Sequence, residues 1–390
     1  MSEASPGALA RGVSAGRELS AGFERRRRRL VLALDGRVAA GYPRFLRLWR
    51  RPVVRVLLIL AALLLVAVLQ PRTHLEWKLS HVLFDYEFGF VKRGLVGELF
   101  TLAGGPVTLD RFFWAFAACY LVLIGVVTAV VAGLPRTASP VILLYLCATP
   151  MLMRNVFYDW GRFDVFGLIA MWLIVLMLAR DWPGRPWLYA LAPLTAFAHE
   201  VNLLVVCPFA LMAILVFEPG GWRGRWRPAL ALCLTAGATG AVLHLYGRLD
   251  VPPETMTAYI ATKTPDRFEE PMYVLTTTLS ENMAERAAFI FDKVVSFKYG
   301  FKFAVVVLLL YWLVPPRLRR SRVALAMLAI ALAFLPLYLV ATDTFRWLAL
   351  QAHAAFAFLV LAVARLEIAR LPRDRAYWAA ASVLVPAMGV

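Results

Sequence analysis

Long apolar runs, separated by short segments rich in Arg, Gly and Pro, dominate this chain of 390 residues. A helix that crosses the hydrocarbon layer of a bilayer needs roughly 17 to 25 apolar residues, and several runs here have that length. Hydrophobic residues make up 61% of the sequence, more than the core of a soluble domain requires. Because backbone in lipid must satisfy its own hydrogen bonds, these runs predict an all-α, polytopic transmembrane helical bundle.

The apolar runs predict about eleven membrane spans. They lie near residues 53–70, 112–134, 140–153, 165–179, 187–198, 201–217, 228–246, 301–314, 323–341, 348–365 and 377–390. Residues 1–52 are expected to form a basic cytoplasmic segment that contains an interfacial helix, with a disordered basic tail as the alternative. Residues 53–390 then form the transmembrane domain.

The distribution of charge predicts the orientation of this bundle. Lys and Arg number 42 against 25 acidic residues, but much of the excess lies before the first span, including Arg25 to Arg29. Such a cluster indicates an anchor on anionic lipid headgroups and not a nucleic-acid-binding surface. With the N-terminus inside, the short inside loops hold 13 Lys or Arg and 4 acids, while the outside segments hold 14 and 17. We therefore expect an integral protein of a bacterial inner membrane with a cytoplasmic N-terminus.

The first outside loop, residues 71–111, carries the most informative motif. Residues 73–84 have apolar side chains at helical spacing, which predicts an in-plane interfacial helix. The pair Asp85 and Glu87 follows, and two such carboxylates can bind a divalent cation such as Mg or Mn, or act on a substrate hydroxyl. Next come Lys92 and Arg93, which can hold a phosphate. The alternative is an interfacial loop with ordinary charges.

Two further outside turns carry ionisable residues at or below the depth of the headgroups. Residues 154–164 contain Asp159, Arg162 and Asp164, which predict either substrate binding or salt bridges among themselves. His199 and Glu200 follow only about twelve apolar residues, so we expect them in a recessed cavity. There they would bind a polar substrate or transfer protons, or else His199 is simply structural.

The last outside turn and the long outside loop complete the candidate site. Asp343 and Arg346 lie in a tight turn before the span at 348–365, and Arg346 is a candidate phosphate ligand. The loop at 247–300 is long enough for helices over the mouth of the bundle, either as a lid over a substrate cavity or as a passive surface. Walker, GxGxxG, HExxH, CxxC and GxSxG motifs do not occur in a suitable context.

With Asp85-Tyr86-Glu87 between two predicted in-plane segments directly after the first span, the layout resembles the GT-C type polytopic membrane glycosyltransferases. More loosely it resembles bacterial O-antigen or exopolysaccharide polymerases. The resemblance covers spans one to about seven as architecture, but only this motif as sequence. It implies sugar transfer outside the cytoplasm, from a polyprenyl-phosphate or polyprenyl-diphosphate donor to a glycan or lipid acceptor.

The same resemblance implies a division of roles. Asp85 would be the general base on the acceptor hydroxyl, and Glu87 would assist it or bind metal. Lys92, Arg93, Arg162 and Arg346 would stabilise charge on the leaving phosphate. Two alternatives remain open, namely a transporter or flippase of a lipid-linked glycan or other anionic substrate, and a non-catalytic assembly subunit.

Overall fold

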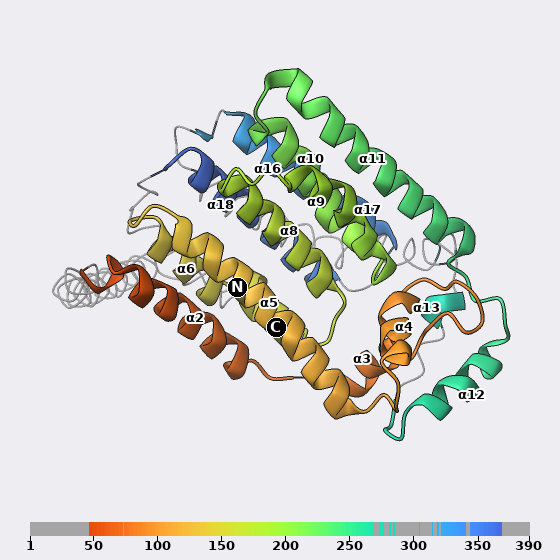
Figure 1. Cartoon of the computed structure of the whole chain (residues 1–390). Helices are drawn as coiled ribbons and strands as arrows, with labels where there is room; N and C mark the ends of the chain where they lie inside the picture. Colours follow the sequence, from red (N-terminus) through yellow and green to blue (C-terminus); the bar gives the residue numbers. More distant parts are fainter. Residues whose placement is uncertain are drawn as a thin grey trace, which may run out of the picture. The chain divides into compact units, whose positions relative to one another are not determined.

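The computed structural model describes residues 47–72, 74–268, 273–276, 281, 284, 304, 314, 318–319, 321–340 and 344–368 (Figure 1). Within these residues the regular secondary structure is entirely helical, as the sequence predicts. The chain divides into two compact units, Met1–Arg55 and Val56–Val390. The architecture and the sites below belong to the second unit.

Four described helices are long and apolar enough to cross a membrane. They are α2 (Pro52–Leu69), α5 (Leu109–Gly133), α11 (Gly221–Tyr246) and the segment Arg346–Arg365 of α18 (Thr344–Arg365). A fifth span results if α6 (Ser139–Ala148) and residues Met151–Tyr158, which are bent by 47° at a short break, cross together. The polytopic helical membrane architecture is therefore confirmed.

The predicted count of about eleven spans is not confirmed. Several predicted spans are shorter apolar helices, namely α8 (Asp164–Ala179), α10 (Asn202–Phe217) and the run Arg322–Leu337, which contains α16 (Arg322–Leu332) and the start of α17 (Leu335–Val340). The predicted span at 377–390 lies outside the described residues, as does all of 301–314 except residues 304 and 314.

Prolines explain why some predicted spans are broken. The run at 140–153 changes at Pro150, where α6 gives way to the irregular turn η1 (Pro150–Arg154) and to α7 (Asn155–Tyr158). The run at 187–198 forms α9 (Arg185–Leu191) and then the 3-10 segment η2 (Ala192–Phe197), which contains Pro193. Proline has no backbone N–H and clashes with the preceding helical turn, so an α-helix seldom continues through it.

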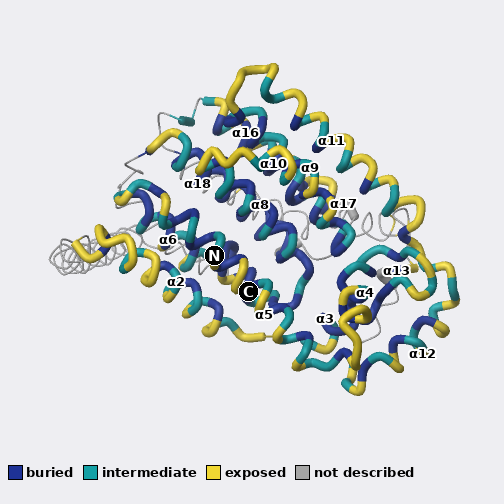
Figure 2. The backbone as a smooth tube through the Cα atoms, in the orientation of Figure 1, coloured by how far each residue is buried: buried dark blue, intermediate teal, exposed yellow. Residues whose placement is uncertain are grey.

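The core of the bundle is formed by α8, α10 and α18. Helix α8 packs against α5, α10 and α18, and α18 also packs against α16. Buried residues make up 94% of the apolar window of α18 but only 11% of that of α11. Figure 2 shows the same contrast, with α8 and α18 mostly dark blue and α11 largely yellow. Apolar residues exposed on α11 and α2 therefore face the region that lipid would fill.

Arginine and tryptophan mark one end of the bundle, which we call the basic end. Arg185 Nε donates to Glu218 at 2.8 Å and joins the start of α9 to the end of α10. Arg365, at the end of α18, pairs with Asp181 at 2.6 Å. Nearby along the chain, Trp182, Trp187 and Trp222 are exposed. Exposed tryptophans beside basic residues are typical of a membrane interface.

The opposite end, at which α8, α10 and α18 begin, we call the loop end. It carries the first outside loop, with α3 (Leu75–Val82) and α4 (Gly94–Leu102), followed later in the chain by α12 (Pro253–Lys263). Figure 1 shows α3, α4 and α12 grouped with α13 (Tyr273–Thr276) beside the ends of α5 and α11. The two short helices expected in the first outside loop are thus present.

The described part of the long outside loop is bonded to the first outside loop. Val107 donates its backbone N–H to the carbonyl of Lys263 at 2.8 Å. Leu109, at the start of α5, donates its backbone N–H to the Asp266 carboxylate at 2.6 Å. These bonds hold α12 against the loop that contains the predicted Asp85 motif.

Candidate functional site

Most of the predicted site residues meet at the loop end. They come from four separate parts of the chain, namely the start of α4, the turn before α8, the turn before α10 and the first turn of α18. The residues that converge are Arg93, Asp159, Arg162, Asp164, His199, Glu200 and Arg346. Asp343 lies outside the described residues.

Arg93 and Glu200 form the first pair of this cluster. Arg93 caps the start of α4 in a left-handed conformation, with φ of 67°. Its Nε donates to Glu200 Oε2 at 2.9 Å, and its Nη2 donates to Oε1, so the contact is two-pronged. Burial alone would raise the pKa of Glu200, but the charge of Arg93 outweighs it and holds that pKa well below its usual range. Glu200 is therefore an anion that is already paired.

Arg346 and Asp164 form the second pair, and both residues are buried. Arg346 donates from Nε and Nη2 to the two carboxylate oxygens of Asp164, each at 2.6 Å. His199 connects the two pairs, because its Nε2 lies 3.2 Å from Arg346 Nη2 and its neighbour in sequence is Glu200. Burial, reinforced by Arg93, lowers the pKa of His199 to about 3, so its ring is neutral. We call Arg93, Glu200, His199, Arg346 and Asp164 the charge network.

Asp159 and Arg162 flank this network more loosely. Arg162 Nε lies 3.7 Å from Asp159 Oδ1, and its guanidinium stacks 4.6 Å above the ring of Trp77. Burial raises the pKa of Asp159 in spite of Arg162. The sequence left open that Asp159, Arg162 and Asp164 bond only to one another. That alternative is wrong for Asp164, whose carboxylate is bound by Arg346.

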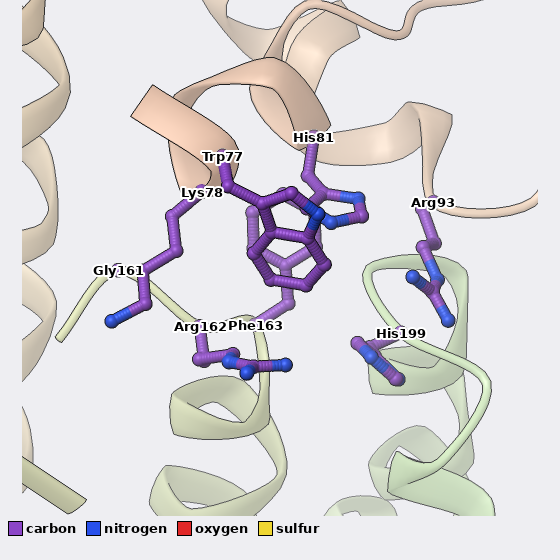
Figure 3. Close-up of a pocket in the computed structure, with 8 residues that line it drawn as sticks. All are labelled: Trp77, Lys78, His81, Arg93, Gly161, Arg162, Phe163 and His199. Carbon is purple, nitrogen blue, oxygen red and sulfur yellow. The ribbon is translucent and has the colours of Figure 1, made fainter. Parts of the chain in front are cut away.

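A small pocket opens between α3 and this cluster (Figure 3). The residues that line it are Trp77, Lys78, His81, Arg93, Gly161, Arg162, Phe163 and His199. Three of them are Lys or Arg, two are His and none is acidic. Its free volume of about 10 Å³ has room for roughly one water molecule. Glu200 and Asp159, outside the lining, offset part of the charge of Arg93 and Arg162, but the lining itself offers only basic groups to an anion, and we call this site the cationic pocket.

His81 is the least expected member of the cationic pocket. Its side chain is buried, and neither ring nitrogen has a hydrogen-bond partner among the described residues. Burial, followed by repulsion from Arg93, lowers the pKa of His81 well below its usual value. A neutral imidazole has one nitrogen that donates and one that accepts. Because leaving both unused in a buried site is unfavourable, this ring is suited to a bound ligand.

Sequence reasoning missed Trp77, Lys78 and His81, which were treated only as part of an interfacial helix. A signal was present, since the three lie at positions i, i+1 and i+4 of α3 and so share the face opposite Leu75 and Leu79. The helix predicted to lie in the plane of the membrane interface also supplies one wall of the cationic pocket.

Asp85 is not part of the cationic pocket. Its buried carboxylate accepts hydrogen bonds at Oδ2 from Lys263 Nζ at 2.5 Å, Tyr259 at 2.9 Å and Thr101 at 2.9 Å. Its Oδ1 accepts from the backbone N–H of Glu87 at 3.2 Å. Burial raises the pKa of Asp85, but the bonds from Lys263 and Tyr259 reverse this, so the net shift is downward. A carboxylate held in this way is a weak base.

The predicted metal site at Asp85 and Glu87 gains no geometric support. The Lys263 ammonium occupies the cation position beside Asp85, and Glu87 is exposed. Among the described residues, no group of three or more His, Cys, Asp or Glu side chains is placed to hold a metal ion. Lys92 lies beside Arg93, and burial lowers its pKa.

The comparisons with known proteins agree with a membrane protein. Residues 52–309 match the family described as "Uncharacterised membrane protein Rv1490". The proteins Rv1490 of Mycobacterium tuberculosis and Mb1527 of Mycobacterium bovis are each 27% identical over 183 residues, which is 43% of this chain. The matched segment spans 41% of the length of those relatives, and no solved structure matches. Because the family match covers well over half of the sequence, the chain belongs to the Rv1490 family of membrane proteins.

Proposed function

We propose that the protein is a membrane glycosyltransferase or glycan polymerase. It would transfer sugar from a polyprenyl-phosphate or polyprenyl-diphosphate donor to a glycan or lipid acceptor on the extracytoplasmic face. The observation that carries the proposal is the cationic pocket, lined by Lys78, Arg93 and Arg162 with no acidic side chain, at the loop end of a membrane bundle.

The lining of the pocket suits a phosphate group. Arg162 offers a planar guanidinium that can bind two phosphate oxygens, and Lys78 adds a compact charge. Arg93 is oriented by its pair with Glu200, so it supplies a fixed donor instead of a mobile one. Since the free volume holds only about one water, the long side chains of Lys78 and Arg162 must swing aside to admit a phosphate.

The proposed reaction breaks the bond between the anomeric carbon of the sugar and a phosphate oxygen. The electron pair leaves with the phosphate, whose charge Lys78, Arg93 and Arg162 stabilise. The acceptor hydroxyl oxygen bonds to the anomeric carbon, and its proton passes to a base. His81 is better placed for that role than Asp85, because His81 faces the pocket while Asp85 is bound by Lys263. An anion beside His81 would also offset the repulsion from Arg93 and raise the pKa of the ring.

Binding is tested with the full-length protein in lipid nanodiscs, using undecaprenyl phosphate and undecaprenol as probes. The phosphate-bearing lipid should bind more tightly than the alcohol, and Arg162→Gln should weaken its binding by about tenfold or more. Arg267→Gln is a matched change at an exposed site outside the pocket, and it should leave binding of the phosphate-bearing lipid unchanged. Equal binding of the two lipids by the native protein would remove the proposal.

Catalysis is tested separately in cells that carry only a variant copy. His81→Gln keeps a polar side chain of similar size but removes the base. Undecaprenyl phosphate should therefore still bind, while formation of the glycan product falls at least a hundredfold. Asp85→Asn should affect glycan formation less. Unchanged product with His81→Gln would show that another group accepts the proton.

A flippase for a lipid-linked anion is the second candidate, since buried polar groups continue beyond the cationic pocket. Trp172 donates its indole N–H to His353 at 2.8 Å, and Gln351 donates to the carbonyl of Ala331 at 2.5 Å, both within the bundle. Movement of a fluorescent undecaprenyl-phosphate analogue across proteoliposomes, without new covalent product, would favour this function over transfer.

A further inference from the structure

A second cavity lies at the other end of the bundle, between α2 and α5. The residues that line it are Val56, Leu60, Gly125, Thr128, Ala129, Ala132, Gly133 and Arg180. Its free volume is about 480 Å³, and its lining is apolar apart from Thr128 and Arg180. We call it the α2–α5 groove. It shares no residue with the cationic pocket.

Small residues of α5 create the groove, and the described part of the protein does not fill it. A methyl group added at Gly125 or at Gly133 would meet no other atom within 4 Å. The groove opens to the outside of the helices, so in a bilayer its volume would be filled by the surrounding medium. Hydrocarbon is the medium that surrounds such a helix.

Thr128 gives a second indication of a ligand. Its side chain is only 6% exposed, yet its hydroxyl has no hydrogen-bond partner among the described residues. In a helix, a threonine hydroxyl usually donates to the carbonyl one turn earlier, as Thr235 does to Ala231 at 2.8 Å. If the side chain of Thr128 turned toward the groove, a polar atom of a bound molecule, such as an ester oxygen, would satisfy its hydroxyl.

Arg180 supplies a charge at the rim of the groove. It follows the last residue of α8, is exposed, and makes no ion pair with another described residue. Two residues later Trp182 is 53% exposed, which is typical of a residue at the depth of the lipid headgroups. A guanidinium at that depth can bind the phosphate of a lipid through two parallel hydrogen bonds.

We propose that the α2–α5 groove binds one anionic phospholipid, with an acyl chain between α2 and α5 and its phosphate on Arg180. The apolar walls match the chain, Thr128 matches an ester group, and Arg180 matches the phosphate. This site is independent of the proposed transferase function, because it lies at the basic end and uses none of the residues that line the cationic pocket.

Native mass spectrometry of the full-length protein tests this proposal, with phosphatidylglycerol and phosphatidylcholine added at equal concentration. The native protein should retain one phosphatidylglycerol more tightly than phosphatidylcholine. Arg180→Gln should weaken retention of phosphatidylglycerol about fivefold. Gly125→Leu should fill the groove and abolish retention of phosphatidylglycerol. Arg223→Gln, which removes a charge from an exposed residue of α11, serves as the control and should retain the lipid.

Thr128→Val keeps the shape of the side chain, so it serves as a second test variant that should fold as the native protein does. It should elute as the native protein does on gel filtration but retain the lipid more weakly. Equal retention of phosphatidylglycerol by the native protein, Arg180→Gln and Thr128→Val would overturn the proposal. Equal retention of the two lipids by the native protein would do so as well.

Discussion

Asp85 takes part in a buried ion pair that the sequence did not predict. Its carboxylate joins the first outside loop to α12 through Lys263 and Tyr259. Removing one partner of a buried ion pair leaves the other charge without compensation and costs about 3 kcal/mol or more. Lys263→Met should therefore lower the free energy of unfolding in detergent by about 3 kcal/mol. The double variant Asp85→Asn/Lys263→Met should recover part of that loss, and a purely additive loss would contradict the pairing.

The same pair predicts a dependence of stability on pH. Because the pKa of Asp85 is lower in the folded protein than its ordinary value of 3.8, the carboxylate stabilises the fold above that value. This stabilisation is lost as the pH falls through the folded pKa. The difference in melting temperature between the native protein and Asp85→Asn should thus be largest near neutral pH and shrink below about pH 4. A constant difference from pH 7 to pH 3 would exclude this role.

The sequence predicted many of the residues that converge at the loop end but not their partners. Arg346, Asp164 and His199 were recognised because ionisable groups near membrane depth are unfavourable unless paired or functional. Their pairing joins positions 182 and 147 residues apart, and only the tertiary fold decides it. His81 was missed because a lone histidine on a helix is ordinary, and its unusual property, two unsatisfied buried nitrogens, exists only after folding.

At the scale of elements, α4 approaches the turn after α3 so closely that only glycine fits. A Cβ added at Gly97 would lie 1.7 Å from the carbonyl oxygen of Phe84, which is backbone and cannot move aside alone. Gly97→Ala should therefore lower the melting temperature strongly, and by displacing α4 it should also disturb Arg93. Gly237→Ala, in α11, meets no atom within 4 Å and should be neutral or slightly stabilising. Thermal unfolding in detergent compares the two, and equal melting temperatures would contradict the close packing of α4.

The elements also show where prediction from periodicity ends. Hydrophobic length located α2, α5, α11 and α18 well, because a long apolar run has few other folds in a bilayer. It overestimated the length of the helix at 187–198, where the seven residues of α9 lead into a 3-10 segment that contains Pro193. The length of an apolar run indicates which segments can lie in the bilayer. It does not show where a helix bends and so brings a polar turn into a pocket.

On the scale of the whole molecule, the arrangement separates a basic end from a loop end that holds the charged cluster. Helices α8, α10 and α18 begin with Asp164, Asn202 and the Arg346 turn at the loop end, and they finish near Arg180, Glu218 and Arg365 at the basic end. Basic residues favour the cytoplasmic side of a bacterial membrane. We therefore predict that the loop end, with the cationic pocket, faces away from the cytoplasm.

Single cysteines test this orientation in intact cells, after Cys119, Cys147, Cys207 and Cys233 are replaced by alanine. Glu87→Cys, at an exposed site of the loop end, should react with a membrane-impermeant maleimide. Arg223→Cys, exposed near the start of α11, should react only after the cells are opened. The reverse pattern would place the cationic pocket in the cytoplasm. A phosphate bound there would then belong to chemistry on the inner leaflet, and sugar transfer on the extracytoplasmic face would have to be abandoned. The contacts of the charge network would not be affected.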